Sequence, residues 1–244
     1  MNLIFDIGNS GTKMAVFDGN EKVTAFRTRE FSCEKLAAKL AKYPTDKAII
    51  CSVRHMPEFI WDLLTLNIPY VHKLTNESRL PFSIEYETPD TLGPDRIAAA
   101  AGAYAMFPGK KILIIDAGSA ITIDLLAGKS FKGGNISPGI NMRFRALHRF
   151  TGKLPLVHFS QEKYSSPGRN TIEAISAGVI NGVLYEINEY IRTFEKKYKG
   201  LEVIIAGGDG GYIRSKINHK VTYMPDIVID GLNYILEYNA KRTS

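Results

Sequence analysis

The chain of 244 residues is 45% hydrophobic and 23% charged, the composition of an ordinary globular protein. This composition excludes a disordered chain, a collagen-like chain and a small disulfide-stabilised domain, and the length allows one large domain or two of moderate size. The 31 basic and 25 acidic residues leave a net charge of +6, which favours anionic ligands. The basic residues form no stripe interleaved with aromatic residues, so we expect no nucleic-acid partner.

The two cysteines, Cys33 and Cys51, belong to no metal-binding or redox motif, so we expect free thiols in a reducing compartment. The first residues carry Asp6 in place of a basic segment followed by a long apolar run, which argues against a signal peptide. No uninterrupted apolar stretch approaches the ~20 residues that a membrane helix needs. We therefore expect a soluble, cytoplasmic protein without a membrane partner.

Two segments, at residues 3–17 and 113–126, repeat one pattern. Each has an apolar strand that ends in Asp-x-Gly, a short polar turn and a second strand returning antiparallel. The repeat predicts a duplicated fold with one lobe over residues 1–107 and another over 108–244. Because strands alternate with helices elsewhere, we predict an α/β protein with a deep cleft between two coupled lobes.

The clearest single element is a helix over residues 171–197, where apolar residues recur at helical spacing between charged ones. A second helix, rich in alanine, is expected over 97–107, and Gly93-Pro94 supplies a cap and a favourable first-turn proline. The other expected elements are a strand at 48–50, a helix at 57–66, an apolar patch at 70–71, a strand at 203–206 and a helix at about 231–240.

The turn inside the first repeat is rich in Gly, Asn and Ser and runs from Asp6 to Lys13. Backbone N–H groups, hydroxyls and the Lys13 ammonium can hold phosphate oxygens, and Asp6 can hold Mg²⁺ through water. The spacing is not that of a Walker loop, and a hairpin turn with a hydrogen-bonded Asp explains the segment equally well. Asp116 stands at the corresponding place in the second repeat, where pseudo-twofold symmetry would make it face Asp6 across the cleft. Two such carboxylates suit a hard cation, which favours the ligand interpretation.

The segment Gly93-Pro94-Asp95-Arg96 precedes the alanine-rich helix. Asp95 can take a proton from a substrate hydroxyl, and Arg96 can orient substrate oxygens. Asp95 would also stabilise a first helical turn against the helix dipole without any chemistry, and spacing alone leaves both explanations open.

Two glycine-rich stretches follow. Residues 133–139 are expected to form a loop in which backbone approaches a ligand, and residues 207–211 suit the flat face of a base or ribose. The second stretch lacks the order of a dinucleotide-binding loop, which argues against NAD. Either stretch can also be an ordinary tight turn. The five histidines show no constellation, and we expect the basic cluster Arg143, Arg145, His148 and Arg149 to be a solvated face, with an interface or an anionic-substrate rim as the alternative.

Taken in order, these motifs resemble the type III pantothenate kinase family over essentially the whole chain. The matching pieces are D-x-G-N-S-x-x-K from Asp6, Tyr86, G-P-D-R at 93–96, D-A-G-S-A-x-T-x-D at 116–124, G-G-x-I-x-P-G at 133–139, Thr171 and Gly207-Gly208. The resemblance implies two duplicated ribonuclease-H-like lobes around a nucleotide cleft, as in the acetate and sugar kinase, chaperone ATPase and actin superfamily. It also implies that ATP phosphorylates the primary hydroxyl of pantothenate to 4'-phosphopantothenate, the first step of coenzyme A synthesis.

The resemblance further implies a homodimer with its active site near the subunit interface, a divalent cation such as Mg²⁺, and K⁺ or NH₄⁺. The residues that would hold the ATP phosphates, with Asp6 also holding the divalent cation, are Asp6, Ile7, Gly8, Asn9, Ser10, Gly11, Thr12 and Lys13. The pantothenate pocket would be lined by Tyr86, Gly93, Pro94, Asp95 and Arg96, with Asp95 as the catalytic base.

In the second half, the resemblance implies that Asp116 binds the monovalent cation and Ser119 the nucleotide. Thr171 would reach pantothenate from the partner subunit. Ser10 and Ser119 stand where threonine is commoner in the family, and both keep the hydroxyl. Asn170 precedes Thr171 where serine is usual.

Two other functions remain open from the sequence. A different small-molecule kinase of the same superfamily could use the same phosphate-binding loops. A regulator of the Bvg accessory factor type could keep the fold without turnover, although the intact Asp6, Lys13, Asp95, Arg96 and Asp116 argue against a degenerate site.

Overall fold

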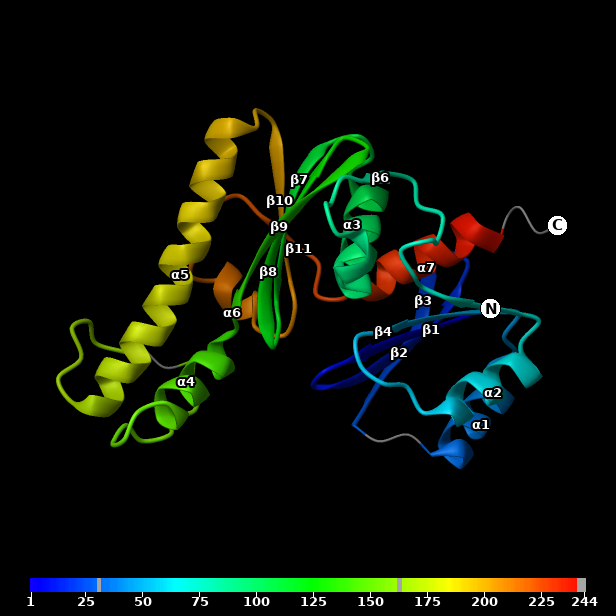
Figure 1. Cartoon of the computed structure of the whole chain (residues 1–244), viewed down its shortest axis with the longest axis horizontal. Helices are drawn as coiled ribbons and strands as arrows, with labels where there is room; N and C mark the ends of the chain where they lie inside the picture. Colours follow the sequence, from blue (N-terminus) through cyan, green and yellow to red (C-terminus); the bar gives the residue numbers. More distant parts are fainter. Residues whose placement is uncertain (30–31, 162–163, 241–244) are drawn as a thin grey trace. The chain divides into compact units, whose positions relative to one another are not determined.

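The first repeat forms the predicted hairpin in the computed structural model, which describes residues 1–29, 32–161 and 164–240 (Figure 1). Strand β1 (Asn2–Gly8) pairs antiparallel with β2 (Gly11–Asp18), which continues into β3 (Glu21–Thr28). On the other side, β1 pairs in parallel with β4 (Lys47–Ser52), and β4 with β5 (Tyr70–Lys73). The sheet therefore has the order β3-β2-β1-β4-β5, with β1 at its centre.

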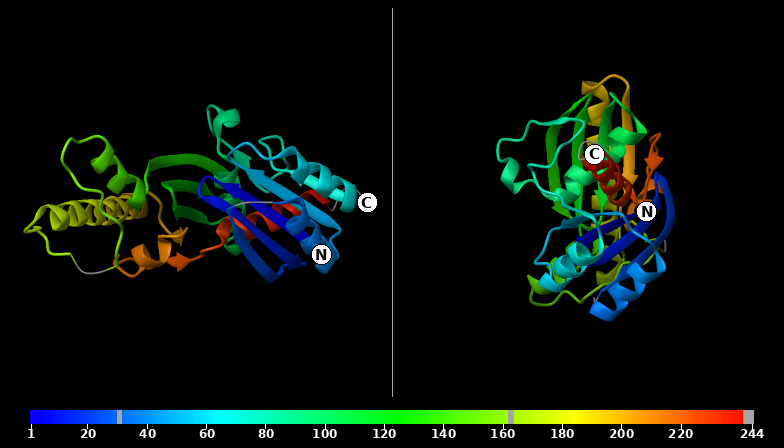
Figure 2. Two further views of the ribbon diagram at one scale, coloured as in Figure 1. Left: turned by 90° about the horizontal axis from the view of Figure 1, so that it is seen from below. Right: turned by 90° about the vertical axis from the view of Figure 1, so that its right-hand side faces the viewer.

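Helices cover both faces of this sheet. Leu36 of α1 (Cys33–Lys42), and Ile60 and Leu64 of α2 (Glu58–Asn67), pack against Phe5 and Ile50 on one face. On the opposite face lie α3 (Pro94–Met106) and α7 (Ile227–Ala240). Both views of Figure 2 show α7 beside the strands of the first hairpin.

Helices α3 and α7 cross in close backbone contact. A Cβ atom added to Gly231 would overlap the carbonyl oxygen of Ala98, and one added to Gly102 would overlap that of Ile227. Only glycine permits this approach, since every other residue would carry its Cβ into the facing backbone. The crossing joins α7, at the end of the described chain, to the N-terminal sheet.

The second repeat also forms a hairpin, in which β7 (Lys111–Ala117) pairs antiparallel with β8 (Ala120–Ala127). This sheet has the order β11-β10-β7-β8-β9-β6. The remaining strands are β6 (Ser83–Ile84), β9 (Ser130–Pro138), β10 (Leu201–Ala206) and β11 (Thr222–Tyr223). A short 3₁₀ helix spans Pro89–Thr91.

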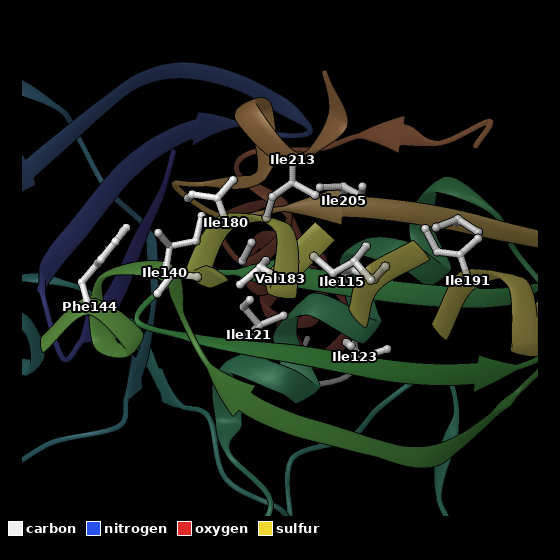
Figure 3. Packing of buried hydrophobic residues seen from close by; sticks show 14 of the residues in the cluster. Ile115, Ile121, Ile123, Ile140, Phe144, Ile180, Val183, Ile191, Ile205 and Ile213 are labelled. Carbon is white, nitrogen blue, oxygen red and sulfur yellow. The ribbon is translucent and has the colours of Figure 1, made fainter. Parts of the chain in front are cut away.

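The predicted long helix is present as α5 (Thr171–Lys197) and covers one face of the second sheet. Figure 3 shows Ile180, Val183 and Ile191 of α5 in a buried cluster with Ile115 and Ile121 of the strands. Helices α4 (Ile140–Arg149) and α6 (Gly210–Arg214) complete this core. The α/β class is thus confirmed, with two sheets and helices packed on them.

The compact units of the structure do not end where the predicted lobes end. Unit 1 comprises residues 1–109, 128–132 and the chain from Asp226 onward, and unit 2 comprises 110–127 and 133–225. The chain therefore returns to unit 1 for α7, a long-range packing that no local pattern reveals. Division into duplicated lobes at residue 107 remains a prediction.

Candidate functional site

Strand register in unit 1 brings three predicted or candidate site residues into one row. Asp6 is the cross-strand partner of Lys13 on β2, and on its other side it is the partner of Cys51 on β4. Because register partners point to the same face of a sheet, all three side chains lie on one face. That face is the one covered by α3 and α7.

The other residues of the predicted phosphate segment are divided between the turn and the core. Asn9 and Ser10 are exposed at the tip of the turn, where side chains and backbone can reach a ligand. Ile7 and Thr12 are partners on the opposite face and are buried, with Ile7 in the core beneath α1 and α2. Their side chains therefore serve packing, so a contribution to phosphate binding is left to their backbone.

Helix α3 begins at the predicted substrate segment. Gly93 is the N-cap residue, Pro94 occupies the first turn and Asp95 is the acidic residue of that turn. The backbone N–H of Arg96 donates to Asp95 Oδ1 at 2.9 Å, which holds the carboxylate at the helix N-terminus. The helix dipole also favours negative charge at this end of a helix. The Asp95 carboxylate is therefore stabilised both by the hydrogen bond and by the dipole.

Cys51 lies near the two candidate carboxylates of unit 1, Asp6 and Asp95, and its position was not predicted from the motifs. Its side chain is fully buried, and burial raises the pKa of the thiol well above its usual value, with further increases from the negative charges of Asp6 and Asp95. Burial and the two negative charges all favour the neutral form of the thiol. In the sequence, Cys51 could have been found from its position directly after the predicted strand at 48–50.

Arg96 is buried, and its guanidinium lies over two aromatic rings. Its Cζ atom is 5.6 Å from the ring centroid of Tyr86 and 5.8 Å from that of Phe131. Cation–π contacts of this kind help to fix the orientation of an arginine side chain. The structure thus brings together Tyr86 and Arg96, which the family resemblance implied to line one substrate pocket.

Lys13 has an acidic neighbour at the start of α7. Its Nζ lies 3.9 Å from Asp226 Oδ1, while Lys22 Nζ lies 2.7 Å from Asp226 Oδ2 and 3.7 Å from Asp230 Oδ1. Burial raises the pKa of Asp226, but the hydrogen bond from Lys22 and the charges of Lys22, Lys13 and Arg27 outweigh it and lower the pKa overall. Asp226 is therefore a carboxylate at neutral pH.

Unit 2 holds Asp116 near the carboxyl end of β7, next to the end of the parallel strand β10. Gly207 follows β10 with φ of 83°, and a Cβ atom there would overlap Asp116 Oδ1 and the carbonyl oxygen of Ala117. The Asp209 N–H donates to the Ala117 carbonyl at 3.0 Å, which closes the 207–211 loop over this strand end. Ser119 is exposed in the β7–β8 turn.

Thr171 is the first residue of α5 and is exposed. The N-cap is Asn170, whose side chain accepts a hydrogen bond from the Glu173 N–H at 2.9 Å. Asparagine caps a helix as well as serine does, so the residue at 170 still fixes the start of α5.

The predicted loop at 133–139 is not present, because β9 extends through residue 138, while an approach of this backbone to a ligand stays a prediction. Its glycines are explained by packing against protein. A Cβ atom on Gly134 would overlap the buried Asp124, and one on Gly139 would overlap the backbone of Gly118 and Ser119. The Gly139 N–H also donates to the Ser119 carbonyl at 3.1 Å, so this glycine supports the β7–β8 turn.

Most of the predicted basic cluster is a solvated face of α4, since Arg145, His148 and Arg149 are largely open to solvent. Arg143 differs, because it donates to the Pro138 carbonyl at 2.8 Å and forms an ion pair with Glu186 of α5.

Among the described residues, no group of three or more His, Cys, Asp or Glu could hold a metal. No helix in the described part of the chain is long and apolar enough to cross a membrane.

The fold is similar to that of several solved structures. A structure from Sinorhizobium meliloti, described as a 2-dehydro-3-deoxygalactonokinase, has a TM-score of 0.60 at 12% identity and covers 100% of this chain and 99% of its own. A structure from Campylobacter jejuni, described as a Baf family transcriptional activator, has a TM-score of 0.61 at 23% identity, covering 98% and 99%. The fold therefore belongs to the class that includes sugar-kinase-like proteins.

Sequence comparison then identifies the family. The family model for type III pantothenate kinase matches residues 2–193. A type III pantothenate kinase from Bacteroides fragilis (strain YCH46) is 42% identical over 244 residues, which cover 99% of this chain and 100% of the relative. The chain belongs to the type III pantothenate kinase family, as its motifs predicted. Membership of this kinase family implies the use of ATP with a divalent cation, and of pantothenate.

Proposed function

We propose that this chain transfers the γ-phosphoryl group of ATP to the primary hydroxyl of pantothenate, forming 4'-phosphopantothenate in the first step of coenzyme A synthesis. One observation carries the proposal. In a chain 42% identical to a type III pantothenate kinase over 244 residues, Asp6 is the register partner of Lys13, and Asp95 lies in the first turn of α3 within the same unit.

In this proposal Asp95 is the catalytic base. Phosphoryl transfer needs little covalent chemistry from the protein, which mainly positions the hydroxyl and the phosphate and stabilises charge. The hydrogen bond from the Arg96 N–H leaves the second carboxylate oxygen of Asp95 to accept the proton of the substrate hydroxyl. Arg96, whose guanidinium lies over the Tyr86 ring, is proposed to contact the carboxylate of pantothenate.

Lys13 and Asp6 hold the phosphates and the divalent cation. Mg²⁺ is usually bound by one or two carboxylates together with substrate phosphates, so a site built on the Asp6 carboxylate suits it. When bound, the cation would neutralise phosphate charge as the transferred group leaves ADP. Lys13 adds a point charge next to Asp6, and the exposed turn at Asn9 and Ser10 offers N–H groups and a hydroxyl.

Asp116 is proposed to hold K⁺ or NH₄⁺, and Ser119 to contact the nucleotide. The proposal draws on the position of Asp116 at the strand end, where its Oδ1 and the Ala117 carbonyl lie close to the Gly207 backbone. Carboxylate and backbone carbonyl oxygens are ligands suited to a monovalent cation. Ser119 lies in the adjoining turn, within the same unit.

A homodimer is proposed in which Thr171 reaches the pantothenate site of the partner subunit. Unit 2 exposes several large apolar side chains on α5 and directly after α4, which supports a partner surface. Exposed fractions reach 58% for Ile172, 68% for Tyr185 and 81% for Phe150. Cβ atoms added to Gly178 and Gly182 would meet nothing within 4 Å, so the same helix offers bare backbone to a partner.

Because its substrate is ATP, we also propose that the enzyme works in the cytoplasm.

The deciding experiment is a coupled assay of ADP release by the purified protein, with and without pantothenate and with K⁺ replaced by Na⁺. Release that requires pantothenate and yields its 4'-phosphate supports the proposal. Release with another hydroxyl compound, and none with pantothenate, would point to a different small-molecule kinase. Nucleotide binding without any turnover would instead support a regulator of the Bvg accessory factor type.

A further inference from the structure

One carboxylate, that of Asp226, is shared unequally by two lysines. It accepts a hydrogen bond from Lys22 Nζ at 2.7 Å, whereas Lys13 Nζ lies 3.9 Å away, beyond hydrogen-bond distance. All three side chains are partly buried, with exposed fractions of 27% for Lys13, 32% for Lys22 and 31% for Asp226. Salt screens an ion pair between partly buried side chains less than one between fully exposed side chains.

The Asp226 carboxylate is held in place by the backbone. Its own carbonyl accepts the Asp230 N–H at 3.0 Å, which is the first turn leading into α7. Residue 226 is also where the chain re-enters unit 1. Because α7 packs closely against α3, the backbone at residue 226 lies at a fixed place within unit 1, with Oδ2 of the carboxylate toward Lys22 and Oδ1 toward Lys13.

The pairing has a consequence for anion binding at Lys13. A carboxylate hydrogen-bonded to Lys13 would offset the charge that phosphate oxygens need, so Asp226 is an internal competitor for this ammonium. Lys22 weakens that competition by taking the hydrogen bond itself. Asp230, 3.7 Å from Lys22 Nζ, helps to keep Lys22 charged, since the two aspartates raise the pKa of Lys22 against the opposing effect of burial.

We propose that Lys22 is a positioning residue for ATP, which holds Asp226 away from Lys13 and so leaves the Lys13 ammonium available to the phosphates. This inference rests on the proposed function, in which Lys13 binds ATP. It assigns to β3 and to the first turn of α7 a part in nucleotide affinity that the motifs do not contain.

The test is a double-mutant cycle read as KM for ATP, kcat and the Kd of a non-hydrolysable ATP analogue. Lys22→Met should raise KM and Kd for the nucleotide about fivefold with kcat nearly unchanged, the effect of a partly exposed ion pair worth about 1 kcal/mol. Adding Asp226→Asn to Lys22→Met should restore both values. Lys22→Arg, which keeps the charge and the donors, should stay close to the wild type.

A matched control is Lys47→Met, because Lys47 forms a similar pair with Glu237 of α7, at 2.8 Å, without contacting Lys13. It should leave nucleotide affinity unchanged. If Lys22→Met does not fold, as judged by thermal melting, Lys22→Gln replaces it in the cycle. An unchanged KM in a folded Lys22 variant, or a raised KM that Asp226→Asn does not restore, would overturn the proposal.

A failure of the proposed role of Lys13 in ATP binding can be distinguished from a failure of the positioning role of Lys22. Lys13→Met should raise KM for ATP by itself, and in that background Lys22→Met should have no further effect. If Lys13→Met leaves KM unchanged, the role of Lys13 in ATP binding fails, and the positioning role of Lys22 fails with it. If Lys13→Met raises KM while Lys22→Met does not, only the positioning role is lost.

Discussion

Asp6 and Cys51 are register partners on neighbouring parallel strands, so a strand-end carboxylate lies directly beside a fully buried thiol. The pKa of this thiol is raised by burial and then by Asp6 and Asp95, which keeps it protonated. A neutral group at this position adds no third negative charge to a place where phosphates are proposed to bind. Serine would keep that neutrality, whereas aspartate would not.

The first prediction concerns Asp95. Asp95→Asn should keep the fold, because the amide oxygen can still accept the Arg96 N–H, and should lower kcat by about 10²- to 10⁴-fold through loss of the base. Steady-state kinetics with pantothenate and ATP measure this, and Asp62→Asn on the exposed side of α2 is the control. Turnover near the wild-type rate would show that Asp95 is not the base.

A second prediction concerns alkaline pH and Cys51. The pKa of this thiol is raised in the folded state, so its contribution to stability is complete below the ordinary thiol value of 9.0 and decreases as pH rises above it. The free energy of unfolding should therefore fall more steeply in the wild type than in Cys51→Ala, by at most about 1.4 kcal/mol per pH unit.

Urea unfolding at about pH 8 and about pH 10 measures the difference. Cys33→Ala is the matched control, because that thiol is exposed, and it should follow the wild type. Equal slopes for the wild type and Cys51→Ala would contradict the prediction.

The third prediction tests Asp116 as the monovalent cation ligand. Asp116→Asn removes the charge but keeps the size of the side chain, so the Gly207 loop beside it should stay in place. We expect most of the rate increase produced by K⁺ over Na⁺ to be lost. The ratio of ADP release in the two salts measures it, and a ratio equal to that of the wild type would assign the cation elsewhere.

A fourth prediction addresses the helix crossing. Gly231→Ala should destabilise the protein by about 1–3 kcal/mol, because the new methyl group has to separate α7 from the Ala98 carbonyl. Chemical denaturation gives the value. Gly152→Ala should change stability little, since nothing lies within 4 Å of a Cβ atom there, and a similar loss in both variants would refute the steric explanation.

The fifth prediction concerns the oligomer. Tyr185→Glu should convert the proposed dimer to a monomer, because a buried interface tolerates an unpaired charge poorly. Light scattering after size-exclusion chromatography measures the mass. Leu66→Glu on α2, where Leu66 is 83% exposed, is the control and should remain dimeric. A dimeric Tyr185→Glu would place the interface on another surface.

Local patterns predicted some elements to the residue and missed others for identifiable reasons. Helix α5 was predicted at 171–197 because its apolar face is long and regular. Strand β3 and helix α1 were not predicted; β3 has no fully buried residue, and α1 buries only Leu36. Helix α7 begins at Ile227, four residues before its predicted start at Gly231.

The residues of the candidate site also divide into those that local patterns predict and those that they miss. Asp6, Lys13, Asp95 and Asp116 could be picked from strand ends and turns, which are local features. The neighbours that shape them could not, because Cys51 and Asp226 reach Asp6 and Lys13 through strand register and through a helix far along the chain. Gly134 and Gly139 suggested a loop for the same reason. The residues against which their backbone packs lie elsewhere in the sequence, so a local pattern does not show them.

The late return of α7 to the first sheet bears on how the protein is made. During synthesis, residues 1–109 leave the ribosome long before residues 227–240, yet that helix covers one face of the N-terminal strands. Domains usually fold as units, with the N-terminal one first. Here one face of the nascent N-terminal sheet lacks the second of its two covering helices until residues 227–240 have emerged, so the packing of that face is completed late in synthesis.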